Sequence, residues 1–234
     1  MKYLHISLIL VCLGVAGCYS PPFERPKMVP MRGTSPEDVI ARYRERMPDE
    51  YEAEETLIFQ VFWKKIAALG YTRVDREEQR FEALCLNHLG VPLFRVTGSR
   101  FGDRFRSRVA KFENFPRFAE SVGADIRRVS FGLVPSDEAE AIVRKDRILF
   151  REERKDGILE YVFGGEDGYL VEKRFLADGW LWRSLRWKVN FYEYVEADGY
   201  VYPRGVVLYN RANRYRLTVK RRDITFDLDS ETME

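Results

Sequence analysis

The sequence has few of the residues and none of the short motifs that mark common enzyme classes. Its 234 residues include three cysteines and two histidines. It has no Gly-x-Ser-x-Gly elbow, no His-Glu-x-x-His motif and no phosphate-binding glycine loop. Residues 164–168 (GGEDG) combine acids with glycines, but the segment is too short for a calcium loop and indicates a turn. We therefore expect no catalytic site, no metal and no cofactor, although a carboxylate pair of the glycosidase type stays open.

Long apolar runs are also absent, except at the start of the chain. Lys2 precedes a mostly apolar run over residues 4–15. A positive start, an apolar run of roughly ten residues and small residues after it are typical of a secretory signal peptide, which is too short to span a bilayer. Residues 15–18, Val-Ala-Gly-Cys, resemble the lipobox of bacterial lipoproteins. This resemblance predicts cleavage before Cys18 and attachment of a lipid to Cys18.

A lipid on Cys18 would make the protein anchored rather than integral. One acyl chain binds a bilayer only marginally, and lipoproteins with a lipobox carry two or three. Tyr19 follows the cysteine, and by the enterobacterial sorting rule the absence of aspartate there implies the outer membrane. We expect residues 1–17 to be a signal peptide and residues 18–34 to be a lipidated N-terminus with a proline-rich extended tether. The alternative is an ordinary signal peptide in which Cys18 falls by chance.

The rest of the composition favours a folded domain. Aromatic residues make up 14% and charged residues 32%, and the formal net charge is +2. With Cys12 in the leader and Cys18 lipidated, Cys85 has no disulfide partner and is expected to be a small buried hydrophobe. His88 lies three residues after Cys85, but on a turn that follows a strand, where the two side chains need not form a nucleophilic pair.

Helical periodicity is confined to three segments. Ser35 is the expected cap of an amphipathic helix that has Pro36 in its first turn and ends before Pro48. A second helix is expected over residues 116–129 and a short third one over residues 138–143. The helices are therefore few.

Alternating apolar and polar residues predict strands through most of the remaining chain. Asp-Gly pairs between them mark hairpins, and the links are too short for the crossover helices that parallel strands need. The sequence therefore predicts an antiparallel meander. Its expected strands cover residues 57–63, 71–75, 81–86, 93–97, 148–151, 159–163, 169–175, 181–194, 200–210, 215–220 and 224–228.

A long meander with one apolar face must be covered by helices or must curl around that face. Because the helices are few, we expect a mainly β (α+β) fold: a strongly curved antiparallel sheet that forms an incomplete barrel, with the helices as a lid or plug. This single domain is expected over residues 35–228, followed by a frayed tail over residues 229–234.

This layout resembles the LolA/LolB lipoprotein-carrier superfamily. The matching elements are the lipobox cysteine, the tether, the N-terminal helix and a meander interrupted by helices. Most of the similarity lies in GYTRVD…FEALCLNHLGVPLFRV over residues 70–96 and in YPRGVVLYN…YRLTVK…DI over residues 202–224. The resemblance implies an incomplete barrel with a helical lid, which binds acyl chains in an apolar cavity without catalysis.

The apolar strand faces supply the candidate cavity. If the helices fill the sheet instead, the same side chains are simply core. The outer-membrane receptor of this superfamily also has an exposed apolar loop for membrane transfer, and its nearest counterpart here is Phe131, Leu133 and Val134. The candidate acyl-chain cavity residues are Phe59, Val61, Trp63, Leu185, Trp187, Val189, Phe191, Tyr215 and Leu217.

Basic residues gather near the end of the chain. Seven lie between residues 204 and 222, a stretch without an acid. Such a cluster favours contact with anionic lipid headgroups, and the alternative is a solvated outer strand face. Nucleic acid is not an expected partner of an envelope protein. The candidate headgroup contacts are Arg204, Arg214, Arg216 and Lys220.

These observations predict an outer-membrane lipoprotein with its domain in the periplasm. It would bind acyl chains and take part in lipid or lipoprotein trafficking. Its partners would be the membrane, through the N-terminal lipid, and an acyl-chain or lipoprotein cargo. The alternative is a non-catalytic scaffold that docks an envelope protein complex, and an envelope hydrolase ranks third.

Overall fold

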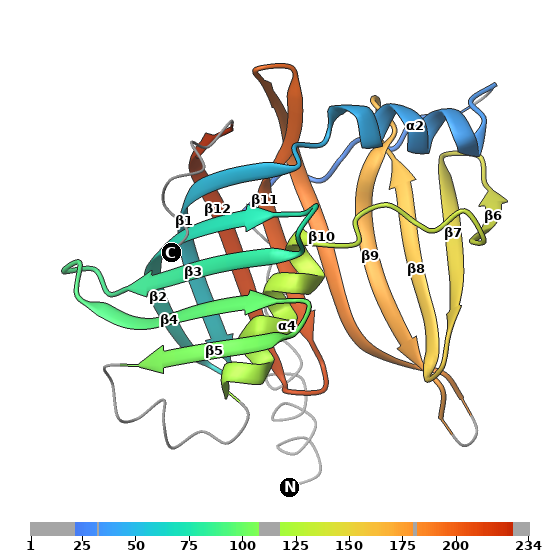
Figure 1. Ribbon diagram of the computed structural model, residues 1–234. Coiled ribbons are helices and arrows are strands. Elements are labelled where there is room, and N and C mark those ends of the chain that lie inside the picture. The colour runs from blue at the N-terminus through green and yellow to red at the C-terminus, as the bar shows by residue number, and fades with distance from the viewer. Residues whose placement is uncertain (1–21, 32, 108–117, 180–181, 227–234) are drawn as a thin grey trace, which may run out of the picture.

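The computed structural model describes residues 22–31, 33–107, 118–179 and 182–226 (Figure 1). Within these residues, twelve antiparallel strands form one sheet and two helices pack against it. The helices are α2 (Pro36–Arg46) and α4 (Phe118–Ser130). The strands are β1 (Glu50–Val61), β2 (Lys64–Asp75), β3 (Arg80–Leu86), β4 (Pro92–Ser99), β5 (Gly102–Ser107), β6 (Glu140–Val143), β7 (Arg147–Arg154), β8 (Gly157–Gly164), β9 (Tyr169–Ala177), β10 (Ser184–Ala197), β11 (Tyr200–Asn210) and β12 (Tyr215–Thr225).

The strand order is β5-β4-β3-β2-β1-β12-β11-β10-β9-β8-β7-β6. Two meanders, β1–β5 and β6–β12, therefore meet where β1 pairs with β12 in the middle of the sheet. β5 and β6 are the two edges, so the sheet is open. The predicted antiparallel, mainly β architecture is confirmed.

Backbone conformation explains the connection between β10 and β11. Asp198 and Gly199 form the two-residue link between β10 and β11, with φ of 51° and 82°. Positive φ at both positions is what a type I′ turn requires, and Asp-Gly is one of the sequences that accept it. The Asp-Gly pair therefore marks a tight hairpin here, as its sequence predicts.

Helix α2 forms where the sequence places it. The Ser35 hydroxyl accepts a hydrogen bond from the Asp38 N–H at 3.0 Å, Pro36 occupies the first turn and Met47 is already extended. Val39 and Tyr43 are the buried residues of the helix. In Figure 1 α2 lies across one end of β8 and β9, and it covers the core there.

Helix α4 shows that the sheet bends. It contacts β4 and β5 at one edge and also β11, which is six positions further along the strand order. In a flat sheet six strand spacings would cover about 29 Å, whereas a 13-residue helix is only about 20 Å long. The sheet therefore bends near α4, which Figure 1 shows between β2–β5 and β10.

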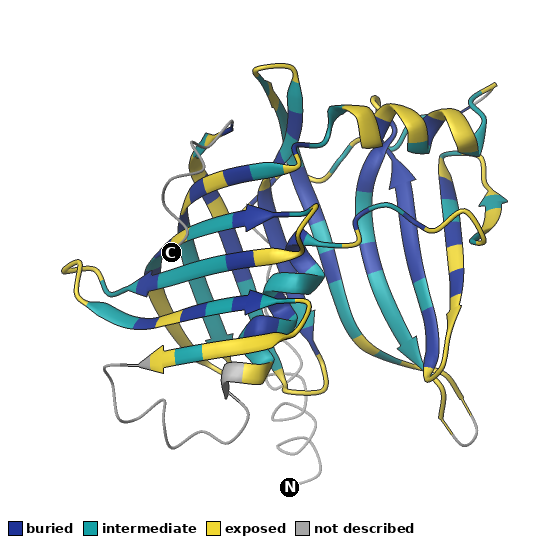
Figure 2. Ribbon diagram, viewed as in Figure 1, coloured by how far each residue is buried: buried dark blue, intermediate teal, exposed yellow. Residues whose placement is uncertain are grey.

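The described residues form two large hydrophobic clusters and a small third one around Phe23, Tyr192 and Val207. The larger cluster joins α2 to the inner face of β7–β11, with Tyr43, Phe163 and Phe191 among its members. Figure 2 shows this concentration of buried residues along β8 and β9. The second cluster lies between β1–β4 and α4, around Val74, Phe81 and Val96. The candidate site lies beside the second cluster.

Several expected elements differ from the structure. The strands expected over residues 57–63 and 71–75 are observed as β1 (Glu50–Val61) and β2 (Lys64–Asp75). The sequence predicts a helix over residues 138–143, but Glu140–Val143 is the edge strand β6, because β-branched Ile142 and Val143 pair with β7. Strand β5 is not predicted at all. The predicted break after residue 220 is absent, because β12 continues to Thr225 along β1, across a register shift between Glu54 and Glu55.

The described part of the predicted tether packs against the domain. Residues 22–31 form no helix or strand, but Phe23 is buried and stacks on Tyr192 with 5.5 Å between ring centroids. The Met31 N–H donates a hydrogen bond to the Lys145 carbonyl at 3.1 Å. The predicted signal peptide, Cys18 and the predicted tail from residue 229 lie outside the described residues.

Candidate functional site

A mostly apolar cavity of about 70 Å³ lies between α4 and one end of the sheet. Strands β1–β4 and β12 form its floor and α4 forms its roof. It is lined by Glu55, Leu57, Phe59, Gly70, Thr72, Ala83, Leu84, Cys85, Phe94, Val122, Asp125, Ile126, Val129, Ser130, Leu217 and Val219.

The sequence pattern explains why these residues meet. Val122, Ile126 and Val129 recur at helical spacing and put one apolar face of α4 on the cavity. Leu57 and Phe59 alternate along β1, so both point to the same face of the sheet. At Gly70 a Cβ atom would lie 3.0 Å from the Leu57 side chain, so the glycine leaves space at the floor.

Two buried carboxylates stand in this apolar lining. Glu55 accepts hydrogen bonds from Thr72 at 3.0 Å and from Arg221 at 3.4 Å. Asp125, on α4, accepts from Arg128 and from the Asn210 amide at 3.3 Å. Burial raises the pKa of the Asp125 carboxyl to about 6, against the opposing effect of Arg128.

The raised pKa predicts a pH-dependent contribution of Asp125 to stability. The folded state binds this proton more tightly than the unfolded state, so the free energy of unfolding should fall as pH rises from about 4 to about 6. Asp125→Asn removes the titration and keeps an acceptor for Arg128 and Asn210. We expect the variant to be more stable than wild type by about 2 kcal/mol at pH 8 and not at pH 4, as measured by urea unfolding. A stability difference that is the same at both pH values would contradict this.

Polar contacts hold α4 over the cavity. The Arg127 guanidinium donates to both Asp103 carboxylate oxygens, at 2.8 and 2.5 Å, and to the Ser99 carbonyl at 2.7 Å. Beyond the end of the helix, Lys173 donates to the Phe131 carbonyl at 2.8 Å. Burial lowers the pKa of Lys173 to about 7.

A further polar contact holds the carboxyl end of α4. Arg76 donates to the Ser130 carbonyl at 2.9 Å. Cationic donors are favoured at a helix C-terminus, where carbonyl groups lack partners. The apolar face of α4 therefore rests on the sheet while side-chain donors secure its end.

The predicted cavity residues separate into three groups. Phe59 and Leu217 line the cavity. Val189 and Phe191 are fully buried in the larger cluster, and Leu185, Trp187 and Tyr215 are half-buried, with Trp187 stacked on Phe175 at 6.1 Å. Val61 and Trp63 are exposed at the end of β1, and Trp63 has 82% of its surface accessible. One group therefore faces water rather than the interior.

The predicted membrane-contacting loop packs largely inward. Leu133 is only 4% exposed, and Phe131 and Val134 are half-buried. Phe131 packs against Phe81, with 6.2 Å between ring centroids. This segment would have to leave the core before it could contact a bilayer.

Exposed aromatic residues occur instead at a different place. Phe62 and Trp63 form the two-residue turn between β1 and β2, and they are 64% and 82% exposed. Phe62 has a φ of 53°, which is rare for a bulky residue and which glycine or asparagine would adopt more easily. Exposed Lys64 and Lys65 follow directly. The sequence gives no signal for this turn, because no glycine, proline, asparagine or aspartate lies near it, and residues 57–63 are therefore expected as one strand.

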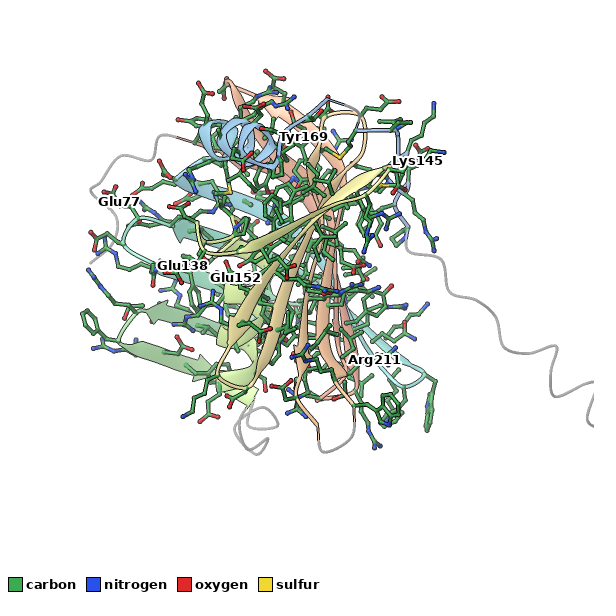
Figure 3. The ribbon with its side chains drawn as sticks, turned by 90° about the vertical axis from the view of Figure 1, so that its right-hand side faces the viewer. Glu77, Glu138, Lys145, Glu152, Tyr169 and Arg211 are labelled. Carbon is green, nitrogen blue, oxygen red and sulfur yellow. The ribbon has the colours of Figure 1, made fainter. Side chains whose placement is uncertain are left out.

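This turn lies at the same end of the strands as two other connections. Val61 pairs with Tyr215, so the β11–β12 turn with Arg211 and Arg214 lies beside it. The β9–β10 connection, with exposed Trp182, lies at the same end because Trp187, near the start of β10, pairs with Asn210 at the end of β11. Figure 3 places Arg211 at the opposite end of the molecule from Tyr169 and Glu77. We call the described residues of these three connections, 62–63, 178–179, 182–183 and 211–214, the hairpin rim.

The predicted headgroup contacts are spread over the sheet. Arg214 lies in the hairpin rim and Arg216 on β12 next to it, where Arg216 bonds Gln60. Lys220 is exposed four residues further along β12. Arg204 lies on β11, toward the other end of the sheet. Two of the four residues are therefore at or beside the rim.

Cys85 is not placed as a nucleophile. It is buried, and burial raises the pKa of its thiol to about 12, whereas His88 is exposed. Among the described residues, no group of three or more His, Cys, Asp or Glu side chains could hold a metal ion. No helix in the described part of the chain is both long and apolar enough to cross a membrane.

Comparison with solved structures identifies the fold. A LolA superfamily protein from Nitrosomonas europaea matches with a TM-score of 0.54 at 6% identity, over 85% of this chain and 97% of that chain. An outer membrane lipoprotein-sorting protein domain from Vibrio parahaemolyticus matches with a TM-score of 0.52 at 10% identity, over 84% and 93%. The chain has a LolA-like fold. This confirms the structural similarity to the LolA superfamily that the sequence predicted.

A solved structure from another family also resembles this chain. A DUF1329 family protein from Desulfovibrio piger matches with a TM-score of 0.52 at 10% identity, over 82% of this chain and 91% of that chain. No protein-family model and no curated protein matches the sequence. Because one fold hosts several functions, the function must be argued from the site.

Proposed function

We propose that the protein is a non-catalytic, membrane-anchored lipoprotein that binds acyl chains in outer-membrane lipid or lipoprotein trafficking. The observation that carries the proposal is the apolar cavity beneath α4. The sheet would act as a strongly curved, incomplete barrel, and α4 would act as its lid. A pocket with an apolar lining and a few polar groups is the usual form of a small-molecule site.

Because the cavity is small, the proposal requires α4 to move when an acyl chain binds. A cavity of about 70 Å³ is too small for a long acyl chain, which needs several times that volume. Val122, Ile126 and Val129 form the apolar roof, so displacing α4 would open a continuous apolar surface above the second hydrophobic cluster. The contact of Arg127 with Asp103 would have to break, and it is partly exposed to water.

The hairpin rim supports a membrane-facing orientation. Phe62 and Trp63 offer exposed apolar surface, and Lys64 and Lys65 offer charges that anionic headgroups attract. Aromatic residues with an apolar body are favoured at a membrane interface. In the proposed orientation the hairpin rim contacts the periplasmic surface of the outer membrane.

A lipid on Cys18 is compatible with that orientation. Phe23 packs against Gly205, which lies five residues before the end of β11 and so about 17 Å from the hairpin rim. Five residues also separate Cys18 from Phe23, and they reach at most about 17 Å. The anchor and the hairpin rim could thus engage the same bilayer.

A scaffold lipoprotein without a lipid ligand is the second candidate. The observation that favours it is the small volume of the cavity beside two filled clusters. Such a protein would dock an envelope complex and would keep α4 closed. The two candidates differ in whether lipid is taken up.

Native mass spectrometry of protein purified gently from envelopes tests the proposal. Wild-type protein is expected to carry a stoichiometric lipid or acylated peptide. Val122→Trp places a large side chain in the cavity and should reduce uptake of added phospholipid at least about 10-fold, since about 1.4 kcal/mol of lost binding has this effect. The matched variant Val143→Trp, on exposed β6, should bind as wild type does. A wild-type protein that is free of lipid and takes up none would favour the scaffold.

A further inference from the structure

The outer face of β3–β5 carries a hollow that the proposed function does not use. Its volume is about 530 Å³. On β4, Phe94 and Val96 are buried in the cluster beneath α4, so Arg95 and Thr97 between them point to the opposite face. The hollow is lined by Arg80, Phe81, Glu82, Arg95, Thr97, Gly98, Ser99, Gly102, Arg104 and Arg106.

The charge of this hollow is strongly positive. Four of its lining residues are arginines and only Glu82 is acidic. Arg80 pairs with Asp75 at 3.1 Å and Arg95 pairs with Glu82 at 3.2 Å. In the described part of the chain, Arg104 and Arg106 make no ion pair or hydrogen bond through their side chains. Two exposed guanidinium groups therefore have their donors available.

The strand register makes the positive charge costly. Arg95 lies directly opposite Arg106 on the neighbouring strand. Like charges in directly opposed positions destabilise a sheet. A bound anion would relieve this repulsion, and the Thr97 hydroxyl adds a neutral donor beside it.

Protection of an edge strand explains only part of the cluster. Charged side chains on β5 would discourage pairing with another chain. However, Arg80 and Arg95 belong to β3 and β4, which are paired on both sides. Their position in a hollow with Arg104 and Arg106 indicates recognition of an anion.

The distance of the hollow from the hairpin rim decides between two sources of the anion, a lipid headgroup and an acidic segment of a protein. By register, Arg106 lies level with Arg95, Leu84 and Tyr71, and Tyr71 is seven residues along β2 from Lys64. This places Arg106 about 23 Å from the hairpin rim, and Arg80, which pairs with Asp75, about 36 Å from it. The Debye length is about 8 Å at physiological ionic strength. If the rim contacts the membrane, as in the proposed function on which this step rests, headgroups lie out of range.

We propose that this hollow binds an acidic segment of a periplasmic protein partner. The guanidinium groups of Arg104 and Arg106 bind its carboxylates, because the planar guanidinium fork matches a carboxylate with two parallel hydrogen bonds. The partner docks on the face of the sheet opposite α4, so the lid stays free while the partner is bound.

Fluorescence anisotropy with labelled hexaglutamate tests this inference on the full-length protein. Wild type should bind hexaglutamate and not hexaglutamine, and binding should weaken with salt. Arg104→Gln with Arg106→Gln should raise the Kd about 10-fold. The control Arg144→Gln with Arg222→Gln removes the same charge from exposed positions elsewhere and should change the Kd less than 2-fold.

Three outcomes would overturn the inference. The first is no binding of hexaglutamate by wild type, and the second is equal weakening by both double variants. The third is binding of phosphatidylglycerol vesicles, instead of hexaglutamate, that depends on Arg104 and Arg106. Lipid uptake in native mass spectra should be unchanged by Arg104→Gln with Arg106→Gln. A wild-type protein that binds hexaglutamate but takes up no lipid would contradict the proposed function and leave the peptide result standing.

Discussion

Replacing Arg221 by methionine is expected to lower the free energy of unfolding by about 3–5 kcal/mol. Arg221 is 5% exposed and pairs with Glu55, which is 7% exposed, at 3.4 Å. It also donates to the Pro203 carbonyl at 3.2 Å and lies over the Tyr51 ring at 5.5 Å. Without Arg221, the Glu55 carboxylate would be left buried and without its counter-charge.

A double variant separates this charge effect from lost packing. Glu55→Leu with Arg221→Met replaces the pair by apolar groups, so most of the lost stability should return. The Thr72 hydroxyl loses its acceptor in this variant, which costs about 1 kcal/mol. Urea unfolding of the two single variants and the double variant provides the measurement. A double variant no more stable than Arg221→Met would show that packing of the arginine, not its charge, stabilises this region.

Replacing both aromatic residues of the β1–β2 turn by serine is expected to weaken membrane binding about 100-fold. Burial of one large apolar side chain contributes about 1.5–3 kcal/mol, and Phe62 and Trp63 would each be partly buried in the interface. The proposed acyl anchor on Cys18 would hide this effect, so the comparison needs the Cys18→Ser form. Cosedimentation with vesicles of phosphatidylethanolamine and phosphatidylglycerol measures the change.

Phe101 provides a matched control for the turn. It is 89% exposed in the β4–β5 connection, away from the hairpin rim. Phe101→Ser removes a similar exposed aromatic group, and vesicle binding should stay within 2-fold of the parent. Equal losses from Phe101→Ser and from the Phe62→Ser, Trp63→Ser variant would argue against an oriented membrane contact.

Local signals predicted much of the fold. The cap at Ser35, the proline at position 36 and the apolar spacing of α2 depend only on neighbours in sequence, and this helix was predicted closely. The alternation along β1, β10 and β12 likewise marks strands whose two faces differ in burial. Asp198-Gly199 fixes its hairpin through backbone conformation alone.

The site was harder to predict, because alternation shows which face a residue occupies but not what covers that face. Phe59 and Trp63 lie on one face of the β1 pattern, yet only Phe59 is beneath α4, while Trp63 extends past the end of the strand. Leu133 appeared suited to a membrane loop, but long-range packing buries it. The buried carboxylate of Asp125 also depends on contacts with β11 that no local pattern reveals.

The central pairing of β1 with β12 has a consequence for how the chain reaches its native state. Every other pair of neighbouring strands is consecutive in sequence, whereas the residues that join β1 to β12 are more than a hundred positions apart. Closing so long a loop costs entropy and makes such contacts form slowly. Each meander is therefore able to assemble first, with β1 or β12 as an unpaired edge open to aggregation. Nascent molecules should be most vulnerable until those two edges meet.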